Sequence, residues 1–171
     1  MTVLATTLGD DPAVDAAHAF AGDPVVHLPG SAAYETARRA WNTAADQRPA
    51  AVAVPVTVKD VCRVVRTAGQ HGLRVAAQNT GHAAAPLARR DLGDVVLMRT
   101  GALRDVHVDA ARRTARIGGG ARWQQVVDAA APHGLTAAHG SAPDLGVVGY
   151  VLGGGLGWYA RRHGLAANAL R

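Results

Sequence analysis

The chain has 171 residues, of which 49% are hydrophobic and 18% are charged, so it suits one globular domain, or one domain of two lobes, and not a disordered segment. No apolar run approaches the roughly 20 residues that cross a bilayer, and residues 1–15 lack the basic start and apolar centre of a secretory signal. The single cysteine, Cys62, excludes an internal disulfide and suits a reducing cytosol, so we expect a cytoplasmic protein without membrane contacts.

The net charge of +5 comes almost entirely from arginine, which occurs in scattered pairs and not in runs. A nucleic-acid-binding surface needs clustered basic residues interleaved with aromatic ones. Aromatic residues make up only 4% of this chain. We therefore expect no nucleic-acid partner, and an arginine-rich nucleic-acid binder is the least favoured function.

Residues 1–30 show no strong period and predict a lead-in with one short helix around residues 14–20. Ser31 is a suitable N-cap for a helix that runs to about Trp41. The apolar run at residues 51–54 then predicts a short strand.

Thr57 and Asp60 form a capping-box pattern that begins the next helix. One face of that helix carries apolar residues at helical spacing, which predicts packing on a sheet: Val61, Val64, Val65 and Ala68. Gly72 ends the helix, and residues 74–78 predict a buried strand, so the segment fits a βαβ unit with a right-handed crossover. Residues 79–82 follow that strand directly, at the sheet edge where α/β proteins bind their ligands.

The second half of the chain predicts more strands and another helix. Residues 94–99 form an apolar strand, and residues 106–109 and 114–117 alternate as the strands of a hairpin. The helix that follows has an apolar face made of Trp123, Val126, Val127 and Ala130. The tail, residues 161–171, begins an apolar segment after Gly164 that has no partner left in the chain, so we expect exposed edges and association.

Residues 139–158 are the most unusual stretch, because glycines alternate there with small and apolar residues. Glycine is favoured where the backbone needs a positive φ, or where another group approaches closer than a Cβ allows. One interpretation is a backbone surface against a large, flat, partly charged ligand, whose phosphates the N–H groups hold. The other is a buried, tightly turned loop packed on a neighbouring strand. The stretch alone favours neither.

His82 is the histidine best placed to carry chemistry, because it follows Gly81 at a strand end, although an ordinary loop histidine also fits there. The histidines show no metal-type spacing with cysteine or carboxylates, so we predict no metal site. Ser141 does not lie in a Gly-x-Ser-x-Gly nucleophile motif, and no Walker A sequence is present. Residues 155–160 match Gly-x-Gly-x-x-Ala, but the ribose-binding acid expected about 20 residues later is missing, which weakens a Rossmann interpretation.

Several short blocks occur in a specific order and spacing: residues 48–52, 75–82, 108–109 with 113–120, 134–135, and 140–157 followed by 159–168. Through them the chain resembles the flavin-binding half of the vanillyl-alcohol oxidase and p-cresol methylhydroxylase family, in its berberine-bridge-enzyme-like branch. The resemblance covers roughly residues 30–171. It implies an α+β fold, the two-lobed FAD-binding domain of the p-cresol methylhydroxylase type, incomplete at the C-terminus.

The resemblance also implies how the chain is divided. Residues 1–30 would be a lead-in, and residues 31–171 an FAD-binding domain with lobes at about 31–100 and 101–171. The family's separate substrate domain, which usually carries the catalytic base, is absent from this chain. We therefore predict no catalytic residue here, and a fragment that is inactive without that domain.

The cofactor that the resemblance implies is FAD, with its pyrophosphate on the loop 78–82 and on the segment 140–149. The expected cofactor-binding residues are Gln78, Asn79, Thr80, Gly81, His82, Gly140, Ser141, Gly146, Val147, Gly149, Gly153, Gly154 and Gly155. His82 falls on the family's histidine that is often joined covalently to the 8α-methyl carbon of the flavin, and a neutral imidazole nitrogen is the nucleophile that such a bond needs.

Two departures from the family pattern change what we expect. Ala142 stands where the doubly tethered members have a cysteine, so we predict one covalent link at most, through His82. Asn79 and Thr80 stand where many members have glycines, so the pyrophosphate loop is expected to be less open.

The function that the resemblance implies is that of an FAD-dependent oxidoreductase. Hydride would pass from a CH–OH or similar substrate to flavin N5, with dioxygen as the expected electron acceptor. The alternative is a non-catalytic nucleotide-binding or assembly fragment without turnover.

Overall fold

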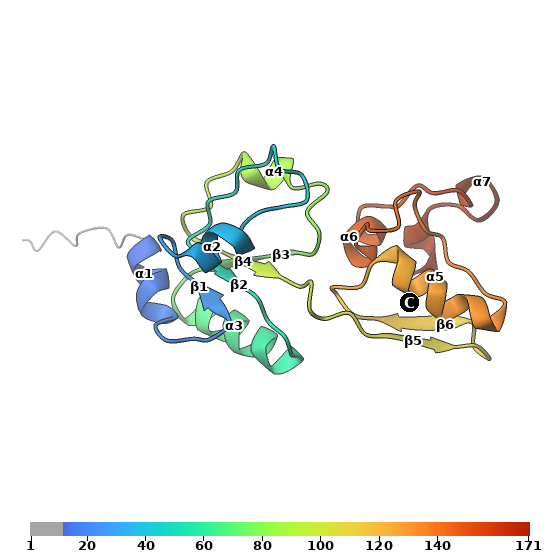
Figure 1. The fold of residues 1–171 in the computed structure, drawn as a ribbon, viewed down its shortest axis with the longest axis horizontal. Coiled ribbons are helices and arrows are strands. Elements are labelled where there is room, and N and C mark those ends of the chain that lie inside the picture. Colours follow the sequence, from blue (N-terminus) through green and yellow to red (C-terminus); the bar gives the residue numbers. More distant parts are fainter. Residues whose placement is uncertain (1–11) are drawn as a thin grey trace, which may run out of the picture.

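The structure, a computed structural model, describes residues 12–171, which form two bodies lying end to end (Figure 1). The N-terminal body, residues 12–99, contains a four-stranded sheet, and the C-terminal body, residues 106–171, contains a two-stranded hairpin. Residues 100–105 lead from one body to the other. The predicted lead-in lies in part outside the described residues.

The sheet of the N-terminal body has the strand order β1–β2–β4–β3. β1 (Val26–His27) runs antiparallel to β2 (Ala51–Ala53), whereas β2 and β3 (Arg74–Gln78) are both parallel to β4 (Val95–Arg99). The predicted βαβ connection joins β2 to β3, but β4, which comes later in the chain, lies between them. β3 is therefore an edge strand, and the prediction of a buried strand is wrong: Arg74 and Ala77 are exposed.

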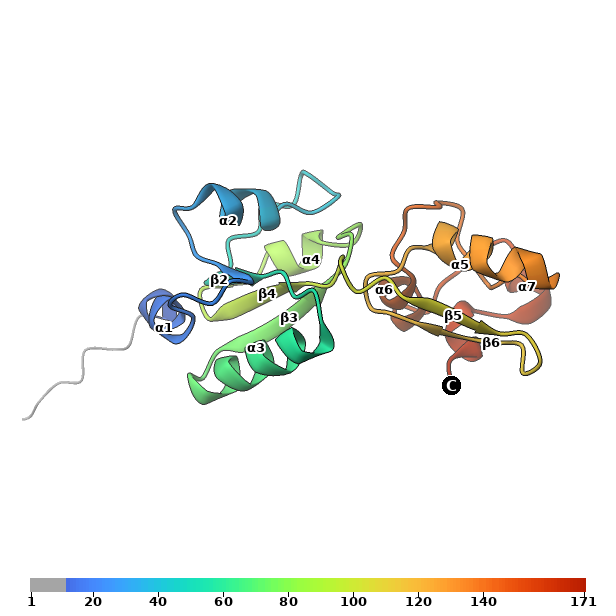
Figure 2. The same cartoon turned by 60° about the horizontal axis from the view of Figure 1, so that its bottom comes forward.

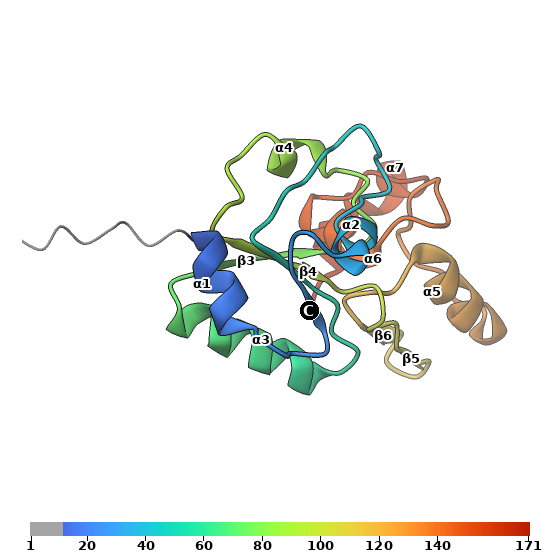
Figure 3. The ribbon, with the colours of Figure 1, turned by 60° about the vertical axis from the view of Figure 1, so that its left-hand side comes forward.

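Helices cover both faces of this sheet (Figures 2 and 3). α1 (Pro12–Ala19) and α3 (Val58–Gln70) lie on one face, where Val64 packs in a cluster with Val96. α2 (Ala32–Ala37) and α4 (Ala85–Ala88) lie on the other face, where Tyr34 packs in a cluster with Leu97. Neighbouring residues of β4 enter opposite clusters because successive side chains of a strand point to opposite faces.

The predicted start of α3 is confirmed. Thr57 Oγ1 accepts a hydrogen bond from the N–H of Asp60 at 3.2 Å, and the Asp60 carboxylate accepts one from the N–H of Thr57 at 2.9 Å. The predicted apolar stripe is wrong at Val65, which is 48% exposed because it lies on the rim of the face that Val64 and Ala68 bury.

α2 is shorter than its sequence predicts. Its last residue is Ala37, and the chain then leaves the helix and runs toward the end of β3. There the N–H of Trp41 donates to the carbonyl oxygen of Thr80 at 2.8 Å. This long-range hydrogen bond takes the place of the next helical turn. No local pattern in the sequence predicts it.

The C-terminal body is built on the predicted hairpin of β5 (Val106–Asp109) and β6 (Thr114–Ile117). α5 (Trp123–Ala130) packs against β5 and buries Trp123, Val126 and Ala130, as predicted, whereas Val127 is half-buried. The remaining elements of this body are η1 (Ala131–His133), α6 (Val147–Leu152), α7 (Ala160–His163) and η2 (Ala166–Ala169).

The C-terminal tail pairs with an earlier part of the chain, so the expectation that it has no partner is wrong, whereas the expected association stays a prediction. The N–H of Ala166 donates to the carbonyl oxygen of Gly155 at 2.8 Å, and the N–H of Ala167 donates to that of Gly154 at 2.9 Å. Ala166 is buried in the same cluster as Val151. The tail therefore packs on the glycine-rich stretch that precedes it.

The glycine-rich stretch also encloses the ring of Tyr150. A Cβ at Gly155, where φ is +70°, would lie 2.6 Å from Tyr150 Cε1, and one at Gly140 would lie 3.1 Å from Tyr150 Cε2. The ring meets Trp123 edge to face, with centroids 5.5 Å apart. Burial raises the pKa of the Tyr150 phenol. Close packing inside the body thus accounts for these two glycines, as the second of the two interpretations expects.

None of the helices between residues 12 and 171 combines the length and the apolar character of a bilayer-crossing segment, and α3, with 13 residues, is one of the longer ones. The same residues contain no group of three histidine, cysteine or acidic side chains close enough to share a metal ion.

Candidate functional site

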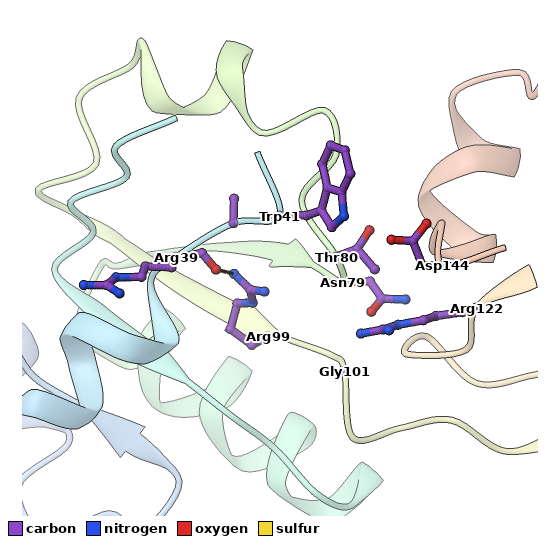
Figure 4. A pocket seen from close by; sticks show the side chains of 9 residues that line it. Arg39, Trp41, Asn79, Thr80, Arg99, Gly101, Arg122 and Asp144 are labelled. Carbon is purple, nitrogen blue, oxygen red and sulfur yellow. Dashed lines mark hydrogen bonds between the residues drawn. The ribbon is translucent and has the colours of Figure 1, made fainter. Parts of the chain in front are cut away.

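An open cleft of about 260 Å³ lies where the two bodies meet (Figure 4). The carboxyl ends of β3 and β4 open into it, as expected for a parallel sheet. The C-terminal body closes the other side. The residues that line the cleft are Arg39, Ala40, Trp41, Asn79, Thr80, Arg99, Gly101, Arg122 and Asp144.

The loop after β3 is held in place by its neighbours. Gly81 has φ +82°, and a Cβ there would lie only 2.8 Å from the Cβ of Ala40, so the position admits glycine alone. The Gln78 side-chain oxygen accepts a hydrogen bond from the Arg99 guanidinium at 2.9 Å. The fixed loop leaves its last side chain, His82, in a defined place.

His82 contacts three other side chains. Its ring stacks on Trp41 with centroids 4.0 Å apart and planes 11° apart. Nδ1 lies 2.9 Å from Thr80 Oγ1, whereas Nε2 is buried, has no hydrogen-bond partner in the described part of the chain, and lies 3.8 Å from Asp144 Oδ1. A buried ring nitrogen without a hydrogen-bond partner is uncommon in folded proteins because it costs free energy, and such atoms often belong to functional sites.

Asn79 joins the two bodies. Its side-chain N–H donates to the carbonyl oxygen of Ala121 at 3.1 Å, and a Cβ at Gly146 would lie 2.7 Å from that amide nitrogen. The hydroxyl of Thr100 makes a second link, to the carbonyl oxygen of Gly119 at 2.9 Å. The Asn79 side chain fills space that a glycine would leave free, which agrees with the expectation of a less open loop.

The cleft carries an excess of positive charge. Arg99 and Arg122 turn their guanidinium groups toward it against one carboxylate, Asp144, whereas the Arg39 side chain points away from them (Figure 4). Within residues 12–171, no carboxylate oxygen lies within 4.0 Å of the three guanidinium groups, although other arginines in the chain are paired. Burial lowers the pKa of Arg99, because no acid compensates its loss of water. Such a surface attracts an anionic ligand.

The predicted site residues are not all in one place. Asn79 and Thr80 line the cleft, and Gln78, Gly81 and His82 adjoin it. Gly146 and Val147 are buried at the contact with Asn79 and Ala121, while Ser141 is exposed and Gly149 has open space where a Cβ would be. None of the predicted residues between 140 and 155 lines the cleft: Gly140, Gly154 and Gly155 pack within the C-terminal body, and Gly153 is exposed on it.

Seven residues that line the cleft were not predicted from the sequence: Arg39, Ala40, Trp41, Arg99, Gly101, Arg122 and Asp144. Arg99 could have been found, because it ends a strand parallel to β3 and must reach the same sheet edge as Gln78. Trp41 and Arg122 carry no such signal, since each reaches the cleft through a loop whose path depends on the folded chain.

The fold and the cleft define an FAD-binding domain of the p-cresol methylhydroxylase type. A family model described as "FAD binding domain" matches residues 49–171, and the chain belongs to that family, which confirms the resemblance seen in the sequence. (R)-6-hydroxynicotine oxidase of Paenarthrobacter nicotinovorans is 33% identical over 143 residues, covering 84% of this chain and 31% of that protein.

Solved structures agree with this assignment. A variant of Physcomitrella patens BBE-like 1 gives a TM-score of 0.75 at 28% identity and covers 93% of this chain and 34% of its own. Glucooligosaccharide oxidase from Acremonium strictum gives 0.72 at 29% identity and covers 93% and 33%. This chain thus spans about a third of the length of the relatives it matches.

Proposed function

We propose that the cleft binds FAD and that the chain is the cofactor-binding part of an oxidoreductase. The observation that carries the proposal is the meeting, at one cleft, of two arginines that no carboxylate neutralises with His82, whose ring is held in place by Trp41 and Thr80. When bound, FAD supplies a two-electron oxidation, in which hydride leaves a CH–OH or similar group for flavin N5 and dioxygen is the final acceptor.

The residues of the cleft fit the charge of FAD. Arg99 and Arg122 lie on different bodies and can both neutralise a diphosphate, which carries negative charge between the two halves of the cofactor. Backbone N–H groups of the loops 78–82 and 140–149 are the further donors in this proposal. An anion that contacts both bodies would also hold them together.

We propose His82 as the point of a single covalent link to FAD. The similar glucooligosaccharide oxidase from Acremonium strictum carries a 6-S-cysteinyl, 8α-N1-histidyl FAD. In this chain Ala142 offers no thiol, and Cys62 lies on the outer helix α3, so a second link has no donor. The role of the protein is to present an imidazole nitrogen at a fixed place.

Substrate selection and the catalytic base are assigned, in this proposal, to a domain outside these 171 residues. The relatives that this chain matches are about three times longer, and their names include oxidases of a hydroxynicotine and of oligosaccharides. The residues described here would hold and tune the cofactor without choosing the substrate.

We also propose that the protein is located in the cytosol.

The test is to purify the protein, incubate it with FAD, and precipitate it with acid. In the wild type, flavin is expected to stay in the acid pellet. In His82→Ala, FAD is expected to bind but to be extracted by acid. In the control His107→Ala, whose side chain is exposed on β5, flavin is expected to stay in the pellet as in the wild type. A wild-type protein that binds no FAD would overturn the proposal. FAD binding without any turnover, even with the complete protein, would favour the non-catalytic alternative.

A further inference from the structure

The two ring nitrogens of His82 have different surroundings. Nδ1 faces the Thr80 hydroxyl at 2.9 Å, and Nε2 faces the Asp144 carboxylate at 3.8 Å. Nε2 is buried, although the His82 side chain as a whole is 19% exposed. The exposed part of the ring therefore excludes Nε2.

This asymmetry selects one tautomer of the neutral ring. A threonine hydroxyl can donate or accept, so Thr80 satisfies Nδ1 in either tautomer. A carboxylate only accepts, and at 3.8 Å from a buried nitrogen its negative charge favours an N–H there over a lone pair. The proton is therefore expected on Nε2, with the Thr80 hydroxyl donating to Nδ1.

Trp41 fixes the plane of the ring. The indole stacks on the imidazole at 4.0 Å, yet 60% of the Trp41 surface is exposed, so this side chain is not held by a core. Its backbone N–H donates to Thr80, the residue whose hydroxyl meets Nδ1. Tilting the imidazole would break the stacking, and flipping it by 180° in its own plane would break the hydrogen bond to Thr80.

We propose that Asp144, Thr80 and Trp41 are positioning residues that hold His82 as the Nε2–H tautomer, with a lone pair on Nδ1 that becomes reactive when the Thr80 hydroxyl turns away from it. The purpose of this arrangement rests on the proposed covalent link to FAD. Attachment at Nδ1 breaks one C–H bond of the 8α-methyl carbon and the Nε2–H bond and forms one C–N bond. Two electrons and two protons pass to dioxygen, which becomes hydrogen peroxide, and Asp144 is the group that first takes the Nε2 proton.

The first test needs no cofactor. Long-range ¹H–¹⁵N spectra of the ¹⁵N-histidine-labelled protein report which nitrogen of His82 carries the proton, and His82→Gln identifies its signals. We expect the Nε2–H tautomer in the wild type, a mixture in Asp144→Asn, whose amide can donate as well as accept, and recovery in Asp144→Glu. Asp105→Asn, an exposed matched control, is expected to match the wild type. An Nδ1–H tautomer in the wild type, or no change in Asp144→Asn, would overturn the inference.

The second test uses saturating FAD and follows acid-stable flavin with time. Attachment is expected to slow about tenfold or more in Asp144→Asn, as for other residues that orient a reactive imidazole. FAD itself should still bind, because the substitution removes a negative charge from the cleft. Equal attachment rates in wild type and Asp144→Asn would contradict the inference while leaving the proposed function intact. A wild type that binds no FAD would instead remove the proposed function, and the tautomer measurement would still decide the positioning.

Discussion

The two bodies of this chain reach a packed interior by different means. The N-terminal body buries aliphatic side chains on both faces of a sheet, with Val52, Val96 and Leu97 fully enclosed. The C-terminal body has few such residues and instead closes glycine backbone around the ring of Tyr150, which meets Trp123 edge to face. The first kind of core is therefore sensitive to loss of side-chain volume, and the second to a Cβ added at the glycines that touch Tyr150.

The largest effect is expected at the centre of the N-terminal sheet. Leu97→Ala removes a fully buried side chain that packs between Tyr34 and Val52, and we expect it to cost about 3 kcal/mol of unfolding free energy. Chemical denaturation of wild type and variant measures it. Leu156→Ala, at a side chain that is 75% exposed, is the control and should change stability by less than about 0.5 kcal/mol. Equal losses of stability at the two leucines would mean that β4 does not lie at the centre of the core.

A smaller loss is expected from adding one methyl group to the C-terminal body. Gly155→Ala places a Cβ 2.6 Å from the Tyr150 ring at a positive φ, which should cost about 2 kcal/mol. Gly149→Ala is the control, because nothing lies within 4 Å of its Cβ position and it sits in the helix α6, so it should be neutral or stabilise by up to about 1 kcal/mol. Equal stabilities of the two variants in thermal denaturation would contradict the close packing of Gly155 against Tyr150.

These two cores also show what a sequence can and cannot predict. The capping box at Thr57 and the hairpin at residues 106–117 follow from local patterns, and both are present. The insertion of β4 between β2 and β3 follows from no local pattern, because it depends on which strands pair in space. The loop after β3 was found through its place at a sheet edge.

The glycine-rich stretch shows where prediction from local sequence patterns ends. Its composition indicates close approach, but it cannot tell a ligand from a side chain of the same chain, and for Gly155 the neighbour is Tyr150. Trp41 and Asp144 were missed for a related reason. Each lies in irregular chain: Trp41 meets His82 through the fold of the N-terminal body, and Asp144 meets it only where the two bodies join.

The next prediction concerns the cleft that joins the bodies. Arg122→Gln removes a guanidinium of the C-terminal body that faces the cleft, and we expect it to weaken FAD binding about tenfold, with a smaller dependence on salt. Calorimetric titration at two salt concentrations measures both quantities. Arg116→Gln, on the exposed side of β6, keeps the same net charge as the first variant and should bind FAD like the wild type. A similar loss in both variants would show a general effect of charge and not a site.

The smallest effect is expected from the ion pairs, which are concentrated in the N-terminal body. The hydrogen bond from Arg63 holds the pKa of Asp23 below its ordinary value of 3.8, so the pair stabilises the fold above that pH and loses its effect as the pH falls through the lowered pKa. Asp23→Asn should cost about 0.5–1 kcal/mol at pH 7. The difference from wild type should vanish in acid.

The C-terminal body supplies the matched control for that pair. Asp109 contacts Arg112 at 3.3 Å, but the arginine side chain is 83% exposed, so Asp109→Asn should change the unfolding free energy by an amount near zero at any pH. Denaturation curves of both variants between pH 2 and pH 7 provide the comparison. A pH-independent cost for Asp23→Asn would show that the aspartate acts through packing and not through its charge.

The most direct test of a shared cofactor site is to titrate FAD into the ¹⁵N-labelled protein and follow its backbone amide signals. If the cofactor lies between the bodies, the amides of residues 78–82 and those of residues 140–149 should shift together and saturate at one FAD per chain. Amides of α3, on the far side of the sheet, should stay in place. Shifts confined to one body, or no shifts at all, would contradict a shared FAD site.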